Sequence, residues 1–224
     1  MKTCGVPGCQ AATSRWGTLC NTHKARLRRH GDPQQQGISK NELKPYRQIV
    51  HERWEKNPAN CFWEMAGQRW QVLVGRCRQA LRDHDSGRTT NRSVARACHE
   101  MVKVAEHVEE RDIMETVLSI FLLHETEPRR FRSDQAFVYQ LVRRLRGLTD
   151  VNAGTWYDHS SGKTKRVYSD LPAKTVQAMG RMVIETIGGP ALSFARREMD
   201  LRRKKMEAEA AERSALYQGL EEMS

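Results

Sequence analysis

The strongest constraint on the fold of this chain is the spacing of three cysteines and one histidine near its start. Cys4, Cys9, Cys20 and His23 follow the pattern C-x4-C-x10-C-x2-H. Four thiolate and imidazole ligands at such spacing are typical of a closed tetrahedral zinc site. A unit of about thirty residues has too small a core to fold alone, so bound Zn2+ is expected to supply its folding free energy.

The residues between these ligands favour the same geometry. A Gly-Val-Pro-Gly loop after the first cysteine allows a tight turn toward one ion. Cys20 and His23 are three residues apart, which places them on one face of a helical turn that "KARLRR" can continue. Trp16 and Leu19 are the expected packing residues of this small unit. His30 is the alternative fourth ligand, although it lies farther from the last cysteine.

The stretch "CGVPGC…RWGTLCNTHKARLRRHGDP" resembles the Cys3His zinc-finger module of phage and bacterial DNA-binding proteins, which often lies beside HNH endonucleases. The resemblance covers residues 4–33 and is most specific at the ligands and at "RRHGDP". It implies zinc bound at the four ligands, a role in DNA handling, and a phage or mobile-element origin. It does not extend to residues 34–224.

Nuclease activity does not follow from this resemblance. No HNH pattern of spaced histidines and asparagine follows the module, and the eight histidines are scattered along the chain. The "GKT" at 162–164 lacks the upstream glycine of a phosphate-binding loop, because that position is Tyr157. We therefore expect a protein without catalytic activity. A nuclease of an unrecognised type is the less favoured alternative.

The charge of the chain favours a polyanionic partner. Its net charge is +11 and its pI is about 9.7, and basic side chains bind phosphates with release of counterions. DNA is the expected partner and RNA is the alternative. The residues expected to contact nucleic acid are Lys24, Arg26, Arg28 and Arg29 in the module, and Arg143, Arg144, Arg146, Lys163, Lys165 and Arg166 farther along.

The second basic region has the element order of a winged helix. Helical patterns at about 112–125 and 133–146 precede two short aromatic and β-branched runs around a Ser-Ser-Gly-Lys turn, which predict a hairpin. In a helix-turn-helix with a wing, the basic helix 133–146 would enter the major groove. The alternative is a helical bundle with a solvated arginine face and a β-hairpin flap.

The remaining patterns predict a mainly α-helical chain. We expect a zinc-binding module at 1–33, a flexible linker at 34–38, and a helical domain at 39–189 with a hairpin at about 155–169. A charged helix follows at 190–224. Ser39 and Glu42 fit a capping box, but Pro45 is favoured as the helix start. Asn57 is the expected N-cap of the next helix, and "GGP" at 188–190 is expected to end a later one.

Cysteine use and hydropathy bear on the cellular compartment. No apolar run approaches the roughly 18 residues of a membrane span, and the N-terminus lacks an apolar signal segment. These features indicate no membrane association and a reducing cytoplasm, where clustered cysteines favour metal. The resemblance of residues 4–33 implies that this cytoplasm is that of a bacterium or of a phage-infected host cell. Cys61, Cys77 and Cys98 fall at apolar helical positions and are expected to be buried thiols.

Two functional hypotheses of different classes follow. The first is a zinc-containing accessory or regulatory protein that binds nucleic acid. The second is an interaction factor that binds and inhibits or redirects a host enzyme, with the zinc module as its docking surface. A small closed metal site suits either role, because it stabilises a surface without fixing what that surface contacts. The sequence leaves the oligomeric state open.

Overall fold

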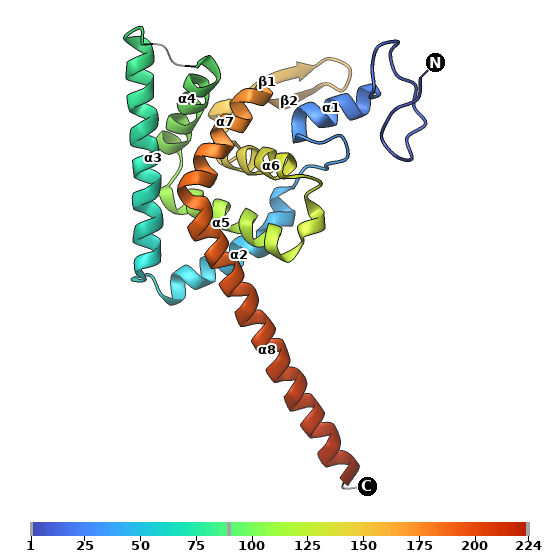
Figure 1. Ribbon diagram of the computed structural model, residues 1–224, viewed down its shortest axis with the longest axis vertical. Coiled ribbons are helices and arrows are strands. Elements are labelled where there is room, and N and C mark those ends of the chain that lie inside the picture. Colours follow the sequence, from blue (N-terminus) through green and yellow to red (C-terminus); the bar gives the residue numbers. More distant parts are fainter. Residues whose placement is uncertain (1, 89–90, 223–224) are drawn as a thin grey trace.

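The computed structural model describes residues 2–88 and 91–222, with the side chains at 152–153, 165–168, 215–217 and 219–222 outside the description. Within these residues the chain is mainly α-helical with one antiparallel hairpin, which confirms the predicted fold class (Figure 1). The α-helices are α1 (Asn21–His30), α2 (Lys40–Lys56), α3 (Cys61–Asp85), α4 (Arg92–His107), α5 (Glu110–Thr126), α6 (Asp134–Arg146), α7 (Ala173–Val183) and α8 (Gly189–Glu222). The other elements are the 3-10 turns η1 (Pro128–Arg130) and η2 (Asp150–Asn152), the strands β1 (Ala153–Asp158) and β2 (Lys163–Tyr168), and the π-helical turn η3 (Ile184–Gly188).

Helix α5 forms the centre of the fold. Every residue from Ile113 to Leu123 is buried, including the polar Glu115, Thr116 and Ser119, so this stretch of the helix is surrounded by other elements on all sides. Helices α2, α3, α6 and α8 pack against it. The run "VLSIFLL", too short to cross a bilayer, is therefore the core of the helical body. Among the described residues, no helix combines the length and apolar character needed to span a membrane.

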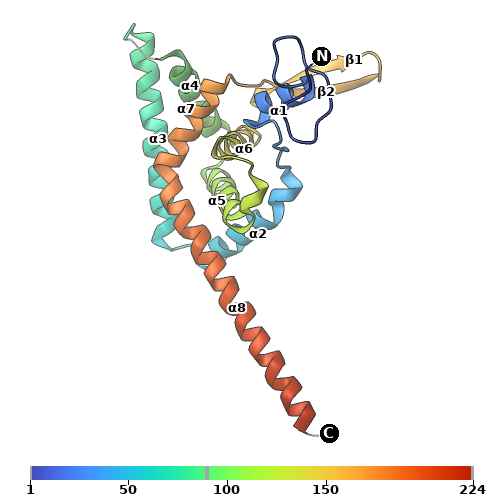
Figure 2. The same cartoon turned by 45° about the vertical axis from the view of Figure 1, so that its right-hand side comes forward.

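The two ends of the chain lie at opposite ends of the molecule. The N-terminal loop and α1 lie beside the hairpin, whereas α8 leaves the helical body and projects alone (Figures 1 and 2). The first turns of α8 pack on α5 through Ala191 and Ala195. Glu198 anchors the helix to α2 by accepting bonds from Arg53 at 2.7 and 3.2 Å. Residues 200–214 are exposed on every side.

Helix α2 begins earlier than Pro45, the favoured start. Ser39 caps it, because the Ser39 hydroxyl accepts from the Glu42 N–H at 3.0 Å and the Glu42 carboxylate accepts from the Ser39 N–H at 3.3 Å. The capping box satisfies two N–H groups that would otherwise lack partners. Pro45 lies inside the helix.

Helix α3 begins three residues later than predicted. Asn60 caps it by accepting from the Phe62 N–H at 2.9 Å, whereas Asn57 ends α2. The two asparagines offer the same capping chemistry, so packing decides between them. Trp54 at the end of α2 stacks on Trp63 at the start of α3, with ring centroids 4.4 Å apart, and the turn between the helices makes this contact.

Glycines at 188–189 do not end the late helical segment as expected. Helix α7 continues through the π-helical turn η3 directly into α8. Gly188 is buried, and a side chain there would contact Ile184 and Phe121. Pro190 is the second residue of α8, where a missing N–H costs little after the widened turn. The charged helix expected at 190–224 corresponds to α8 up to Glu222, and residues 223–224 lie outside the described part of the chain. This helix continues directly from α7 and η3.

Helix α6 has the predicted Ser133 cap but lacks the exposure of a recognition helix. The Ser133 hydroxyl accepts from the Ala136 N–H at 3.1 Å. The helix packs against α1, α4, α5 and α7, and only its first two residues, Asp134 and Gln135, are exposed. A helix that enters a major groove must present a whole face, so α6 cannot play that part in this arrangement. The hairpin itself is as predicted, with Asp158 paired to Lys163 next to the turn.

Candidate metal centre and basic surface

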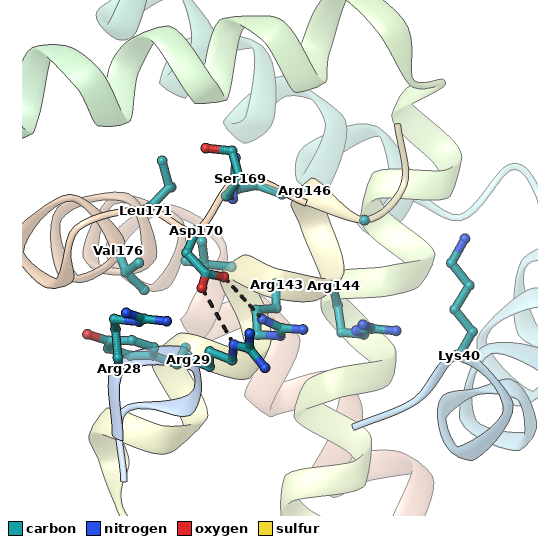
Figure 3. A pocket seen from close by; sticks show the side chains of 13 residues that line it. Arg28, Arg29, Lys40, Arg143, Arg144, Arg146, Ser169, Asp170, Leu171 and Val176 are labelled. Carbon is teal, nitrogen blue, oxygen red and sulfur yellow. Dashed lines mark hydrogen bonds and ion pairs between the residues drawn. The ribbon is translucent and has the colours of Figure 1, made fainter. Parts of the chain in front are cut away.

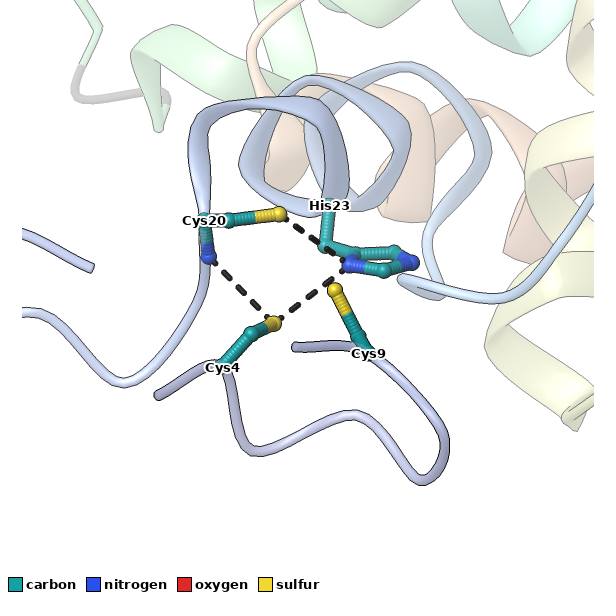
Figure 4. A group of neighbouring side chains, drawn as sticks. All are labelled: Cys4, Cys9, Cys20 and His23. Atoms are coloured by element: carbon teal, nitrogen blue, oxygen red, sulfur yellow. Dashed lines mark hydrogen bonds between the residues drawn. The ribbon is translucent and has the colours of Figure 1, made fainter. Parts of the chain in front are cut away.

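The four predicted ligands converge at the start of α1 (Figure 4). The ligand atoms of Cys4, Cys9, Cys20 and His23 all lie within 4.8 Å of one another. The Nδ1 atom of His23 is 3.4 Å from the Cys4 sulfur and 3.2 Å from the Cys20 sulfur. Tetrahedral bonds of zinc length would separate a sulfur and a nitrogen by roughly 3.6 Å. The group can therefore hold a metal ion with little movement.

Backbone hydrogen bonds hold the ligand loop in this shape. The Cys4 N–H donates to the Ala11 carbonyl at 3.0 Å, and the Cys9 N–H donates to the Val6 carbonyl at 3.0 Å. Gly8 turns the chain between them with a φ of 78°, which favours glycine. Cys20 is the N-cap residue of α1, but its side chain makes no capping bond. Its sulfur faces the ligand group instead.

The electrostatic environment of the four ligand side chains favours a bound cation. Burial acts to raise the pKa of the Cys4 thiol, but backbone N–H groups of Cys20 and Val6 and bonds from His23 and Cys20 outweigh it and lower the pKa to about 6. The Ala11 N–H acts to lower the pKa of Cys9, but burial and the neighbouring thiols of Cys4 and Cys20 raise it. Crowded thiolates repel one another, and a metal ion removes that cost.

His30, the alternative ligand, lies elsewhere. Its Nδ1 atom is 3.1 Å from the Gln140 amide nitrogen on α6. Burial and the nearby charges of Arg143 and Arg29 lower its pKa to about 4. His30 is therefore neutral at neutral pH and accepts the amide hydrogen. It belongs to the contact between α1 and α6.

The segment expected to be a flexible linker is packed between the module and the helical body. Gln35 is fully buried, and its side chain accepts from the Arg132 N–H at 3.0 Å and donates to the Arg130 carbonyl at 3.3 Å. The Ile38 N–H donates to Gln140 at 3.0 Å. Gly31 has a φ of 78°, and a side chain there would meet Tyr139 at 2.7 Å. These contacts fix α1 on α6.

This docking brings two predicted groups of arginines together. Arg28 and Arg29 from α1 and three arginines of α6 line one pocket of about 190 Å3 (Figure 3). Lys40, the first residue of α2, completes its basic lining. Asp170, the acidic residue of the lining, lies 3.7 Å from Arg29 and 3.8 Å from Arg143. The basic residues of the lining are Arg28, Arg29, Lys40, Arg143, Arg144 and Arg146.

The arginines of this pocket differ in their availability. Arg146 is 11% exposed, and it donates to Glu100 at 2.7 Å and to the Ser169 carbonyl at 2.8 Å, which holds the chain before Asp170 in place. Burial lowers the pKa of Arg143, and the neighbouring Arg29 and Arg146 act in the same direction against Asp170. Arg29 remains 56% exposed. The rim is therefore open to an anion, whereas Arg146 is mainly structural.

Three other residues predicted to bind nucleic acid, Lys24, Arg26 and Lys163, lie outside the pocket lining. Lys24 is exposed and donates to Ser14 at 3.3 Å, and Arg26 is half-buried on the same helix. Lys163 is exposed at the start of β2. The side chains of Lys165 and Arg166 lie outside the described part of the structure.

Sequence reasoning missed some residues of this surface. No sequence pattern marks Lys40 as a residue of the basic pocket, because only the packed segment 34–38 brings it there. Trp16, expected to pack, is 87% exposed, with the Arg15 guanidinium 5.3 Å from its ring centre. Cys61 is also exposed, contrary to expectation, whereas Cys77 and Cys98 are buried as predicted.

No family model matches this sequence, and searches of curated proteins and of solved structures also find no match. The candidate site therefore rests on its own geometry.

Proposed function

We propose that this protein is a zinc-containing, non-catalytic accessory or regulatory protein that binds nucleic acid. Zinc is the metal that the donor set fits best, because three sulfurs and one imidazole form a closed tetrahedral site without an open position. The bound ion would supply folding free energy to the module. The module in turn would hold the arginines of α1 against the helical body.

The observation that carries this proposal is the convergence of Arg28 and Arg29 with Arg143 and Arg144 in one pocket. Like charges repel, yet the fold holds these four arginines close together. Asp170 is the acidic residue that the described lining sets against them. A phosphate group would relieve this repulsion, and guanidinium groups bind phosphate through paired N–H donors. The resemblance of residues 4–33 to the zinc module of DNA-binding proteins favours DNA over RNA and a phage or mobile-element origin.

The test is a salt series of nucleic-acid affinity, measured by fluorescence anisotropy with labelled DNA and RNA. The observed affinity should fall steeply with salt, with a slope of about 0.7–0.9 per neutralised phosphate. Changing Arg28→Gln together with Arg29→Gln should weaken binding and reduce that slope by up to about two contacts. Arg76→Gln with Arg78→Gln, two exposed arginines on α3, is the matched control and should change little. Binding that is absent, or insensitive to salt, would contradict the proposal.

A second candidate is a factor that binds a host protein, and the projecting part of α8 favours it. Residues 200–214 are exposed on all sides and include Leu201 and Met206, which are 42% and 69% exposed. An isolated helix in water gains most of its stability from a partner. Capture of one protein after nuclease treatment, lost when the chain is cut after Asp200, would favour this function over nucleic-acid binding.

A further inference from the structure

Three exposed aromatic side chains lie at the end of the molecule that carries the basic pocket. Trp16 is 87% exposed, Trp156 is 55% exposed and Tyr157 is 50% exposed. Trp16 belongs to the metal module, and the other two belong to β1 of the hairpin. In both views of the molecule, the hairpin lies beside α1 (Figures 1 and 2). The basic and the aromatic side chains thus share one end of the fold.

Packing within the metal module does not explain why Trp16 is exposed. The metal module buries Cys4, Val6 and Cys20, while Trp16, its largest apolar side chain, faces water. Large aromatic side chains that are exposed next to cations are typical of surfaces that stack the bases of unpaired strands. The Arg15 guanidinium, 5.3 Å from the Trp16 ring centre, can add a cation to such a stack.

We propose that the nucleic acid bound here is single-stranded, with phosphates at the rim of the basic pocket and bases on Trp16 and on the hairpin aromatics. This inference rests on the proposed function and names its substrate class. In a duplex the flat faces of the bases are already stacked on each other, so exposed indole rings gain nothing from them. Helix α6, the element expected to read a duplex, packs against other helices and does not present a whole exposed face. An unpaired strand can use both the cations and the rings.

The geometry of strand β1 limits which of the two hairpin aromatics can contact the bound nucleic acid. Consecutive residues of a strand point to opposite faces, so Trp156 and Tyr157 lie on different faces of β1. Tyr157 also contacts the ring of His159, with centroids 5.0 Å apart. One of these two aromatic side chains can therefore face the same bound nucleic-acid strand as Trp16. The hairpin is best tested by removing both rings together.

The experiment compares a labelled thymine oligonucleotide of about 20 residues, longer than many single-strand sites, with a duplex of equal length at matched salt. The single strand should bind at least about ten-fold more tightly. Trp16→Leu keeps the apolar character but removes the π face, and it should weaken single-strand binding by about ten-fold. Trp16→Tyr should retain most of the affinity. The double change of Trp156→Ala and Tyr157→Ala should also weaken single-strand binding.

Val72→Ala is the matched control, because Val72 is 51% exposed and belongs to α3, a helix that lies on the other side of the molecule from the module and the hairpin (Figures 1 and 2). It should bind as the unaltered protein does. Metal content is measured for each variant, so that loss of binding is read only where the module is intact. Duplex binding that equals or exceeds single-strand binding, with Trp16→Leu without effect, overturns the inference and leaves the proposed function standing. Absence of binding to either form at low salt overturns both.

Discussion

The metal module and the helical body of this chain are stabilised by different means. The module buries only Cys4, Val6 and Cys20, and two of these are expected metal ligands. The body buries a continuous apolar cluster that runs from Ile38 to Ala195 and includes the fully buried Trp70. The folding of the module should therefore depend on bound metal, whereas the folding of the body depends on buried apolar area. We therefore expect the helical body to keep its fold when the module, with its basic helix α1, loses its metal.

The largest effect is expected from loss of a metal ligand. Cys20→Ser should abolish stoichiometric zinc binding, which in small zinc peptides amounts to about 10–16 kcal/mol. Amide hydrogen exchange should then show loss of protection in the module and retained protection in α5. Cys61→Ser, which changes an exposed thiol outside the ligand group, should do neither. Simultaneous loss of protection in α5 would mean that the two regions are a single folding unit.

The change Trp70→Ala tests whether buried apolar side chains, and not metal, stabilise the helical body. Trp70 is 1% exposed within the apolar cluster, and removing such a side chain costs about 3–5 kcal/mol of unfolding free energy. Chemical denaturation followed by circular dichroism measures the loss. Trp16→Ala changes an exposed side chain and should alter stability by no more than about 0.5 kcal/mol. Equal losses for the two variants would show that Trp16 is buried in solution.

A smaller effect is expected at the joint between the two regions. Ser39→Ala removes the hydroxyl that caps α2 and should reduce the unfolding free energy by about 1 kcal/mol. Ser39→Asp keeps an acceptor at the cap and should restore most of it. Metal content should stay the same in both variants, because the cap belongs to the body. Zinc loss in Ser39→Ala would place this cap in the module instead.

The smallest expected effect is a pH dependence at His30. Its pKa is lowered to about 4 in the fold from an ordinary value of 6.5, so below pH 6.5 the unfolded chain takes up the proton more readily. Stability from this group is complete above that value and falls as the pH drops toward about 4. Because the ring is partly exposed, solvent screening should keep the change at about 1 kcal/mol or less. His30→Asn does not titrate and should flatten this part of the pH profile.

Local chemistry made the ligand group and many elements predictable. The spacing of Cys4, Cys9, Cys20 and His23 brings the four side chains together within one short segment. Ser133 caps α6 as expected because its partner lies three residues away. The hairpin followed from its turn and strand composition. In each case the interacting groups are neighbours along the chain.

The errors arose where distant contacts decide the structure. Gln35 looks like a linker residue, yet it bonds to the backbone of Arg130 and Arg132, nearly a hundred residues away. Asn57 and Asn60 compete for one cap, and the stacking of two tryptophans favours the later one. The apolar pattern of α6 shows which residues share a face, but it does not show how many helices surround them. Lys40 reaches the pocket only through such packing.

The central claim is that the metal places the α1 arginines on the body so that both regions bind nucleic acid together. The most direct measurement is the affinity for a labelled single strand at fixed salt, before and after zinc removal by a chelator and again after zinc is restored. Zinc removal should weaken binding at least as much as the Arg28→Gln and Arg29→Gln pair does, and restored zinc should reverse the loss. Unchanged affinity in a protein whose residues 2–30 have lost their amide protection would contradict this claim.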